Sequence, residues 1–468
     1  MTRLRQGSGG QAPLVRFLLD GAVIEADAAD PTVTLLDHLR YTLRRTGTKE
    51  GCAEGDCGAC TILLGDLDGD AVKWRAVNAC ILFLPMLDGK ALRTVEGLGG
   101  DHPVQREMVA RHGSQCGFCT PGFVMSLYGR SVGALGTEGV PVGDVIAGNL
   151  CRCTGYGPIL AAGEAVPAAA EQDAETVASL RALQPGYGSP KTADALADLL
   201  LARPDTRIVA GATDVGLWVT KQHRDLGPTV FIGDIADLRQ IVETPDALTL
   251  GAAVRYSEAR EALARLHPDL GELVRRIGGV QVRNAGTIGG NIANGSPIGD
   301  MPPALIALGA ELTLRRGSER RTIPLESFFL TYGKQDRAPG EFVESVRIPR
   351  PAPDMLIRIV KLSKRFDSDI SGVCGGFVLR IADGVVAEAR IAFGGMAGIP
   401  ARAPACEAAL TGQPWNEETV EAAAMALAKD YTPLDDLRGS AAYRSKVAAN
   451  LLRRLWAEQA EPVSVLDG

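Results

Sequence analysis

Apolar and polar positions near the N-terminus alternate in short blocks that predict strands and one helix. Leu14–Leu19 is an apolar run, and an Asp-Gly turn signal separates it from a second strand-like run at Ala22–Ala26. Thr34–Arg45 places leucines on one face at helical spacing, which predicts a helix. Two further strands are expected at Thr61–Leu64 and Val72–Ala76, around an acidic turn. Residues 1–100 are therefore expected to form a small β-rich domain.

Residues 101–170 change character, because a proline stands near the start of each helix-like segment. Helix starts are predicted at Pro103, Pro121 and Pro141, since proline is favourable in the first helical turn. A further helical stretch follows Pro158. Four short helices packed as a bundle are expected here. An Ala- and Glu-rich stretch ending in GYGSP comes next, and residues 171–190 are interpreted as a linker.

The second half of the chain alternates helix-like and strand-like segments. Strand signals such as RIVAG, TVFIGDI and LTLGAAV recur over residues 191–352, a pattern typical of an α+β or α/β domain. Residues 353–468 begin with three strand-like runs and end with helices predicted at Glu417–Lys429 and Ser440–Glu458. The fold class expected for the whole chain is α+β with several domains.

Composition narrows the classes of function. The 468 residues suggest about three domains, and 46% hydrophobic residues are ample for several cores. The net charge of −7 and the lack of a long basic run argue against nucleic-acid binding. No apolar run approaches the ~20 residues that span a bilayer. The first 14 residues lack the apolar core of a signal peptide, so a cytoplasmic location is expected.

Eight of the ten cysteines fall between Cys52 and Cys153, and the first set lies in a glycine-rich loop. Cys52, Cys57 and Cys60 have C-x4-C-x2-C spacing, and Cys80 follows after a strand-like segment. This spacing is that of plant-type [2Fe–2S] loops. A zinc site would prefer paired C-x2-C knuckles, and a disulfide framework is not expected in a chain of this size without a secretory segment. The pattern favours an iron–sulfur cluster.

The second set of cysteines lies at the ends of the predicted helices. Cys116 and Cys119 have C-x2-C spacing, and Cys151 and Cys153 have C-x-C spacing. Taken alone, these two pairs could hold zinc. Beside a cluster-bearing domain, four more thiolates favour a second [2Fe–2S] site. Cys374 and Cys406 lie far downstream and are expected to be buried small hydrophobes.

Two later segments have the composition of a phosphate or cofactor loop. Arg207–Trp218 is a strand followed by a tight turn of small residues, whose backbone N–H groups could cradle a pyrophosphate. A plain strand-turn-helix explains this segment equally well. The segment VRNAGTIGGNIANGSPIGD is richer, because it combines glycines with amide, hydroxyl and carboxylate side chains. No G-x-G-x-x-G follows a strand and opens a helix, so a Rossmann site is not indicated.

The two cysteine patterns resemble the double-cluster signature of the xanthine oxidase family of molybdenum hydroxylases. The first pattern is GCAEGDCGAC followed by a later Cys, and the second is QCGFCTPG followed by NLCRCTGY. The resemblance implies a β-grasp ferredoxin-like domain and a four-helix [2Fe–2S] bundle. It implies that one cluster is held by Cys52, Cys57, Cys60 and Cys80, and the other by Cys116, Cys119, Cys151 and Cys153. In the family, the helical-bundle cluster lies nearer the molybdenum cofactor.

The later segments resemble the FAD-binding domain of the same family, which has a vanillyl-alcohol-oxidase-like fold. The resemblance implies an FAD site made of Val209, Ala210, Gly211, Ala212, Thr213, Asp214, Val215, Thr287, Gly290, Asn291, Asn294, Asp300, Val343 and Lys361. It places Tyr332 near the nicotinamide side of the flavin, and Ile277 stands where the family often has an aromatic residue. Core packing is the alternative for Val209, Val215 and Val343, because valine is often buried.

Nothing in the chain resembles the molybdopterin-binding domain of the family, which predicts a split enzyme. The resemblance implies the iron–sulfur/FAD subunit of a xanthine dehydrogenase in an (αβ)2 heterotetramer. A large partner subunit would bind molybdopterin and oxidise hypoxanthine or xanthine, while this chain would pass electrons through two clusters to FAD and NAD. No residue of this chain is expected to catalyse the hydroxylation. An aldehyde or N-heterocycle hydroxylase is the alternative within the family, and a zinc-stabilised scaffold without redox function is the alternative outside it.

Overall fold

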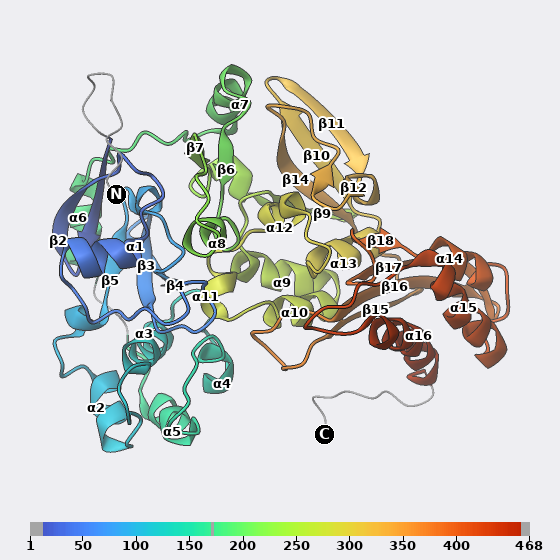
Figure 1. The fold of residues 1–468 in the computed structure, drawn as a ribbon, viewed down its shortest axis with the longest axis horizontal. Coiled ribbons are helices and arrows are strands. Elements are labelled where there is room, and N and C mark those ends of the chain that lie inside the picture. Colours follow the sequence, from blue (N-terminus) through green and yellow to red (C-terminus); the bar gives the residue numbers. More distant parts are fainter. Residues whose placement is uncertain (1–12, 170–172, 460–468) are drawn as a thin grey trace. The chain divides into compact units, whose positions relative to one another are not determined.

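A computed structural model of the protein describes residues 13–169 and 173–459 (Figure 1). The chain forms two compact units. The first comprises Met1–Pro190, Arg207–Phe231 and Val280–Asn284, and the second comprises Lys191–Thr206, Ile232–Gly279 and Ala285–Gly468. The α+β multidomain architecture predicted from the sequence is confirmed. Among the described residues, no helix is both long enough and apolar enough to cross a membrane.

A mixed five-stranded sheet organises the N-terminal part of the first unit. Its strand order is β2-β1-β5-β3-β4, in which β1 and β5 run parallel and the other neighbours run antiparallel, as in a β-grasp fold. The strand β5 lies between the two hairpins, so it joins them into one sheet. The strands are β1 (Leu14–Leu19), β2 (Ala22–Asp27), β3 (Thr61–Asp68), β4 (Ala71–Asn78) and β5 (Ala91–Arg93), with 3-10 turns at Leu84–Leu87 and Val95–Leu98.

The helix predicted at Thr34–Arg45 is only partly correct. Helix α1 covers Leu35–Asp37, and a π-helical turn continues over His38–Thr42. In that turn the Leu43 N–H donates to the His38 carbonyl at 2.9 Å, five residues back. The wider turn leaves both His38 and Leu39 buried. Leucine spacing alone could not distinguish this turn from a regular α-helix.

The four short helices predicted after residue 101 are confirmed, and each has a proline in its first turn or at its N-cap. The helix α3 is buried along most of its length, and Phe123 and Leu127 pack into one core with Leu63 and Trp74 of the sheet. The sheet and the helices therefore share one hydrophobic core. The four helices are α2 (Pro103–Ala110), α3 (Thr120–Ser131), α4 (Val142–Val145) and α5 (Gly157–Ala165), and α6 (Ala174–Ala182) follows them.

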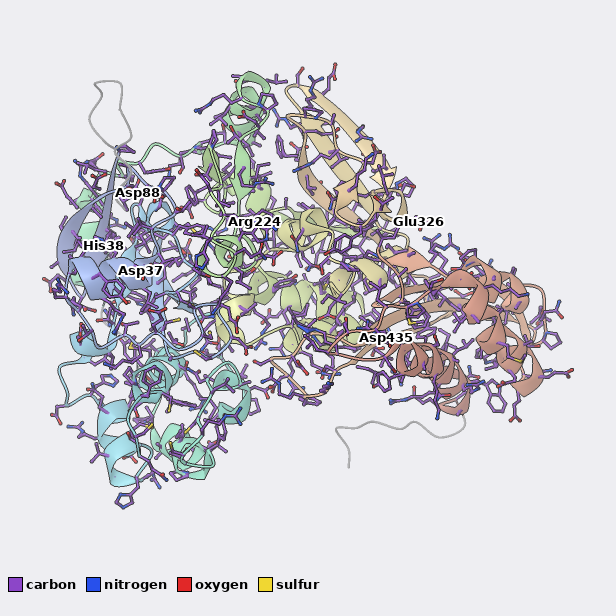
Figure 2. All side chains as sticks on the ribbon, in the orientation of Figure 1. Asp37, His38, Asp88, Arg224, Glu326 and Asp435 are labelled. Carbon is purple, nitrogen blue, oxygen red and sulfur yellow. The ribbon has the colours of Figure 1, made fainter. Side chains whose placement is uncertain are left out.

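The carboxylate of Asp88 fixes the chain that follows α6 to the sheet (labelled in Figure 2). It accepts hydrogen bonds from the backbone N–H groups of Arg16, Gly186 and Tyr187 at 2.9–3.0 Å. Three backbone donors on one carboxylate satisfy groups that the sheet leaves unpaired. The first unit is completed by the parallel pair β6 (Arg207–Val209) and β7 (Thr229–Phe231), by α8 (Val215–Thr220) and by α11 (Val280–Arg283).

The second unit contains a five-stranded sheet with the order β11-β10-β14-β9-β8, and all its neighbouring strands run antiparallel. Buried leucines of β9 and β10 pack with residues of α9, α10, α12 and α13 in one large core. The strands are β8 (Ile241–Glu243), β9 (Ala247–Gly251), β10 (Glu311–Arg316), β11 (Glu319–Pro324), β12 (Phe329–Thr331), β13 (Lys334–Gln335) and β14 (Phe342–Pro349). The helices are α7 (Ala193–Ala202), α9 (Tyr256–Leu266), α10 (Pro268–Arg275), α12 (Ile288–Asn294) and α13 (Met301–Ala307), with 3-10 turns at Ala236–Arg239 and Leu325–Ser327.

A second sheet in this unit is covered by helices on both faces (Figure 1). Cys374 and Val378 of β16 join the core of α13, whereas Phe377 and Leu379 join the core of α14, α15 and α16. Alternate residues of a strand point to opposite faces, so one strand serves both cores. The elements are β15 (Met355–Leu362), β16 (Val373–Ala382), β17 (Val385–Gly394), β18 (Ala401–Arg402), α14 (Pro404–Leu410), α15 (Glu417–Asp430) and α16 (Ala441–Ala457).

Candidate redox centres

The first cysteine set gathers in the loop before β3 and in the turn after β4. Cys52 and Cys57 are partly buried, whereas Cys60 and Cys80 are buried. The Cys52 Sγ accepts from the backbone N–H groups of Glu54 and Asp56 at 3.4 Å and of Cys57 at 3.3 Å. The loop folds back on itself because Ala53, Gly55 and Gly58 have positive φ angles. Three donors on one sulfur are the kind of contact that stabilises a metal-bound thiolate.

Contacts between the thiols shift their pKa values in opposite directions. Hydrogen bonds from the Cys57 and Cys80 thiols lower the pKa of Cys52 far below its ordinary value. The hydrogen bond to Cys52, with burial, raises the pKa of Cys57. The pKa of Cys80 is raised, mainly by contacts with Cys52 and Cys60 and to a smaller extent by burial. The four thiols are thus within reach of one another, as four ligands of one [2Fe–2S] cluster must be.

Glycine is required at two positions of this loop by close packing. A Cβ at Gly51 would lie 2.7 Å from the Cys57 Sγ. A Cβ at Gly58 would lie 2.2 Å from the carbonyl oxygen of Gly148, and the φ of Gly58 is +68°. Any side chain at Gly58 therefore meets both a backbone clash and backbone strain. The shape of this loop therefore depends on the absence of side chains at Gly51 and Gly58.

The second cysteine set forms two neighbouring pairs. Cys119 is the N-cap of α3 and contacts Cys151, while Cys116 contacts Cys153. The Cys151 Sγ lies 3.4 Å from the Thr154 nitrogen, which donates to it, and 3.1 Å from the Thr154 Oγ1. Cys116 and Cys153 are exposed in this chain. The structure therefore gathers all four residues that the sequence grouped together.

The pKa values of this set also diverge. The pKa of Cys119 is raised to about 12, mainly by burial and to a smaller extent by the contact with Cys151. Burial raises the pKa of Cys151, but hydrogen bonds from the Thr154 hydroxyl and N–H outweigh it and the net shift is downward. The pKa of Cys116 is lowered, mainly by a hydrogen bond from the Phe118 N–H and to a smaller extent by the contact with Cys153. That contact raises the pKa of Cys153.

The second cysteine set is grouped as two contacting pairs, whereas in the first set Cys52 and Cys80 each contact two other cysteines. Within residues 13–169 and 173–459, no group of three or more His, Cys, Asp or Glu side chains is arranged to hold a single metal ion. In a [2Fe–2S] cluster each iron takes two of the four thiolates, so the pair is the unit that such a cluster needs. Each set brings four thiols together, which is the number of ligands that one [2Fe–2S] cluster needs.

The two cysteine loops are hydrogen-bonded directly to each other. The Leu150 N–H donates to the Cys57 carbonyl at 2.9 Å, and the Asn149 Nδ2 donates to the Gly58 carbonyl at 3.1 Å. A Cβ at Gly122 of α3 would lie 2.1 Å from the same Gly58 oxygen. Each residue of this contact lies close in sequence to a cysteine of one set. We call the contact of Cys57 and Gly58 with Gly122, Asn149 and Leu150 the loop junction.

The first predicted flavin segment belongs to the first unit. Val209 ends β6 and is fully buried with Phe83 and Phe231, so its side chain is a core residue. Ala212 has a φ of 58°, and its carbonyl accepts from the Gly216 N–H at 2.7 Å. The remaining residues of the turn, from Ala210 to Val215, are partly buried. The segment is therefore a strand followed by a tight turn that leads into α8.

The second predicted flavin segment lies in the second unit and begins at the N-cap of α12. The Thr287 Oγ1 accepts from the Gly290 N–H at 3.0 Å. Gly290 and Asn294 are exposed. The Asn291 Oδ1 is buried and has no hydrogen-bond partner in the structure. A buried acceptor without a donor is costly, so a donor on a bound cofactor would fit this loop.

Two predicted flavin residues contact each other. The Lys361 Nζ of β15 lies 2.6 Å from the Asp300 Oδ2, and both side chains are at least 90% buried. The Ser371 hydroxyl donates to the other oxygen of Asp300. The Cys374 Sγ lies 3.5 Å from the Asp300 carbonyl, and burial raises the pKa of this thiol. The sequence did not single out Ser371 or Cys374 as partners of Asp300, because they lie 71 and 74 residues away.

The other predicted residues of this unit lie apart from that ion pair. Val343 is 6% exposed in β14 and joins the core, which agrees with the alternative of core packing. Ile277 is partly buried against the same core. Tyr332 lies between β12 and β13 and is 75% exposed. The assignment of these residues to a flavin or nicotinamide site stays a prediction.

Comparisons with known proteins match the chain in the same order. The domain described as a 2Fe-2S iron–sulfur cluster binding domain matches residues 17–84, and a [2Fe-2S] binding domain matches residues 94–164. The FAD binding domain in molybdopterin dehydrogenase matches residues 146–351. The CO dehydrogenase flavoprotein C-terminal domain matches residues 358–459. Both cysteine sets thus fall within iron–sulfur domains, which favours iron–sulfur clusters over zinc.

Curated relatives extend along nearly the whole chain. Xanthine dehydrogenase from Emericella nidulans is 30% identical over 94% of this chain, and the enzyme from Drosophila subobscura is 32% identical over 93%. Aldehyde oxidase 2 from Cavia porcellus is 30% identical over 88%. The chain spans 37–38% of the length of these relatives.

Solved structures match more than half of the chain. One is a CO dehydrogenase from Hydrogenophaga pseudoflava that lacks the Mo-pyranopterin moiety of the molybdenum cofactor. It is 31% identical with a TM-score of 0.55, and the match covers 57% of this chain and 96% of that one. CO dehydrogenase from Oligotropha carboxidovorans is 28% identical with a TM-score of 0.54, over 58% of this chain and 97% of that one. The chain belongs to the xanthine oxidase family of molybdenum hydroxylases and carries its iron–sulfur and FAD-binding parts.

Replacing Gly58 by alanine is expected to disrupt the first cysteine loop. The new Cβ would meet the Gly148 carbonyl, so the loop junction must open. We expect Gly58→Ala to lose most of the iron of the first cluster, which is about half of the iron per chain, measured as iron content and visible absorption. Gly69→Ala is the matched control, because Gly69 has a φ of +58° but open space around it. Equal iron content in Gly58→Ala and Gly69→Ala would contradict the packing argument.

Replacing one partner of the Asp300–Lys361 pair is expected to destabilise the second unit. Asp300→Asn leaves the buried ammonium of Lys361 without its counter-charge, at a cost of about 3–5 kcal/mol. The double variant Asp300→Asn/Lys361→Met removes both charges and is expected to recover much of this loss. Chemical denaturation followed by far-ultraviolet circular dichroism measures the effect, because Asp300 and Lys361 are themselves predicted FAD contacts and FAD release would not report stability alone. An additive double-mutant cycle would show that the two side chains do not act as a pair.

Proposed function

We propose that this chain relays electrons between a molybdenum centre and NAD in an enzyme of the xanthine dehydrogenase type. The observation that carries the proposal is the presence of two four-cysteine sets, joined by hydrogen-bonded loops, in a chain that also contains the FAD-binding part of the family. Curated xanthine dehydrogenases match 93–94% of the chain, which supports this substrate class.

The residues of the chain would bind the cofactors and adjust the charge around them. When bound, the clusters would supply one-electron chemistry and the flavin two-electron chemistry. The N–H groups of Glu54 and Asp56 would stabilise negative charge on the Cys52 sulfur, and Thr154 would do the same at Cys151. Burial of Cys60 and Cys80 would exclude water from one side of the first cluster.

The proposal assigns the hydroxylation step to a large molybdopterin-binding partner, in an (αβ)2 heterotetramer. The curated relatives are much longer than the part that this chain matches, which supports a contribution from residues outside it. NAD would accept the electrons on the flavin side where the resemblance places Tyr332 and Ile277. The exposure of Tyr332 leaves its ring accessible to a ligand.

An aldehyde hydroxylase is a second candidate function, because aldehyde oxidase 2 is as similar in sequence as one of the xanthine dehydrogenases. The two candidates differ in substrate and not in the iron–sulfur or FAD sites of this chain. The complex of this chain with its molybdopterin-binding partner should therefore be assayed with xanthine, an aldehyde and an N-heterocycle. Preference for the aldehyde would replace the xanthine assignment and leave the electron-transfer role in place.

Replacing Cys57 by serine is expected to remove one of two [2Fe–2S] signals in the EPR spectrum of the reduced protein. Cys57 would be a ligand of the first cluster, whereas the ligands of the second lie at Cys116, Cys119, Cys151 and Cys153. Cys406→Ala is the control, because Cys406 is buried in α14 of the other unit. Cys406→Ala should retain both signals. Retention of both signals in Cys57→Ser would refute the ligand assignment.

The purified chain is expected to oxidise NADH with an artificial electron acceptor but not to hydroxylate purines. NADH would deliver electrons to bound FAD, whereas purine oxidation would need the molybdenum centre of the partner. Anaerobic bleaching of the visible spectrum by NADH and chromatography of urate test the two halves separately. Purine turnover by this chain alone would contradict the assignment of hydroxylation to a partner.

A further inference from the structure

A short segment of the FAD-binding sequence region lies in the iron–sulfur unit. Helix α11 and Asn284 fall within the 146–351 match, yet they belong to the first unit together with both cysteine sets. Figure 1 shows α11 near β4, which it contacts. Gln281 is 1% exposed and Asn284 is fully buried. Residues three apart in a helical turn lie on one face, so both amides point into this unit.

The Gln281 amide contacts three segments at once. Its Nε2 lies 3.0 Å from the Thr61 Oγ1 of β3, 3.2 Å from the Ser126 Oγ of α3, and 3.0 Å from the Asn149 Oδ1. An amide nitrogen carries two hydrogens, so the three oxygens share two donors. These acceptors lie 132 to 220 residues away in sequence. Gln281 therefore adds a contact from a distant part of the sequence to segments that already contact one another.

All three acceptors either belong to the loop junction or are hydrogen-bonded to a residue of it. The Thr61 hydroxyl donates to the Gly58 carbonyl at 2.6 Å. The Ser126 hydroxyl donates to the Asn149 Oδ1 at 2.7 Å, and Asn149 in turn donates to Gly58. Gln281 thus completes a buried network around the Gly58 carbonyl, which belongs to the loop junction. Its own Oε1 has no partner in the structure, so its donors are the part of the amide that the site uses.

We propose that Gln281 is a positioning residue that fixes the two cysteine sets relative to each other. The separation and magnetic contact of the two clusters would then depend on a side chain from the flavin-binding part of the sequence. This inference rests on the proposed occupancy of both sets by [2Fe–2S] clusters. A purely structural amide would stabilise the unit without affecting the relation between the clusters.

Asn284 offers a comparison within the same turn. It is as deeply buried as Gln281, and its Nδ2 donates to the carbonyls of Ala76 and Leu135 at 3.0 and 3.1 Å. Neither acceptor belongs to the loop junction. Loss of its hydrogen bonds should cost stability of the same order as loss of those of Gln281. Only Gln281 should affect the clusters.

The test compares Gln281→Met and Asn284→Leu in the full chain with both clusters loaded. The readouts are iron content, the splitting of the low-temperature EPR signals by spin–spin interaction between the two reduced clusters, and the rate of electron equilibration after pulse reduction. We expect Gln281→Met to change the splitting and slow equilibration severalfold, and Asn284→Leu to match the wild type in both. Unchanged splitting and rate in Gln281→Met, or the same change in both variants, would overturn the inference.

A second variant decides the question if Gln281→Met does not assemble its clusters. Gln281→Asn keeps a neutral amide but shortens the side chain by one methylene, so its donors draw back from Thr61 and Asn149. A changed splitting in Gln281→Asn supports the inference, and a wild-type splitting overturns it. Failure of the proposed function is recognised separately, because the wild-type chain would then lack one or both [2Fe–2S] signals before any substitution is made.

Discussion

The buried carbonyl of Gly58 sets the main constraint on the iron–sulfur unit. A buried carbonyl needs a donor, and this one accepts from the Thr61 hydroxyl and from Asn149. A side chain at Gly58 or Gly122 would occupy the space that brings these groups together. The first cysteine loop therefore reaches its shape only when α3 and the chain after α4 are in place. The two sets of thiols are parts of one packed structure.

The second unit contains a buried ion pair, whereas the first unit is held by neutral hydrogen bonds around the Gly58 carbonyl. Asp300 stands at the start of α13, and Lys361 lies in β15 of the other sheet. Their buried ion pair joins the end of the glycine-rich segment to the C-terminal sheet. Ser371 satisfies the remaining oxygen of Asp300. A buried charged pair tolerates loss of neither partner alone, so this connection is rigid.

Local patterns in the sequence predicted the elements and the cysteine sets well. Apolar runs marked strands such as β16, and prolines marked the helix starts of the bundle, because both signals act within a few residues. The π-helical turn at His38 was missed because leucines at helical spacing do not reveal which carbonyl each N–H selects. The Asp300–Lys361 pair was missed because its partners lie 61 residues apart. The contacts of Gln281 were missed because their partners lie 132 to 220 residues apart. No local pattern encodes such distances.

The long reach of Gln281 also has a consequence for biosynthesis. The first cysteine loop ends at Cys60, but the network that closes around it includes residue 281, which leaves the ribosome much later. Chains grow at about 5–20 residues per second, so the interval between Thr61 and Gln281 is on the order of 10–40 s. During that interval the cysteines of the loop have been synthesised, but the contacts with Gln281 have not yet formed. Iron and sulfide delivered to this loop during synthesis would therefore meet a more open structure than in the finished chain.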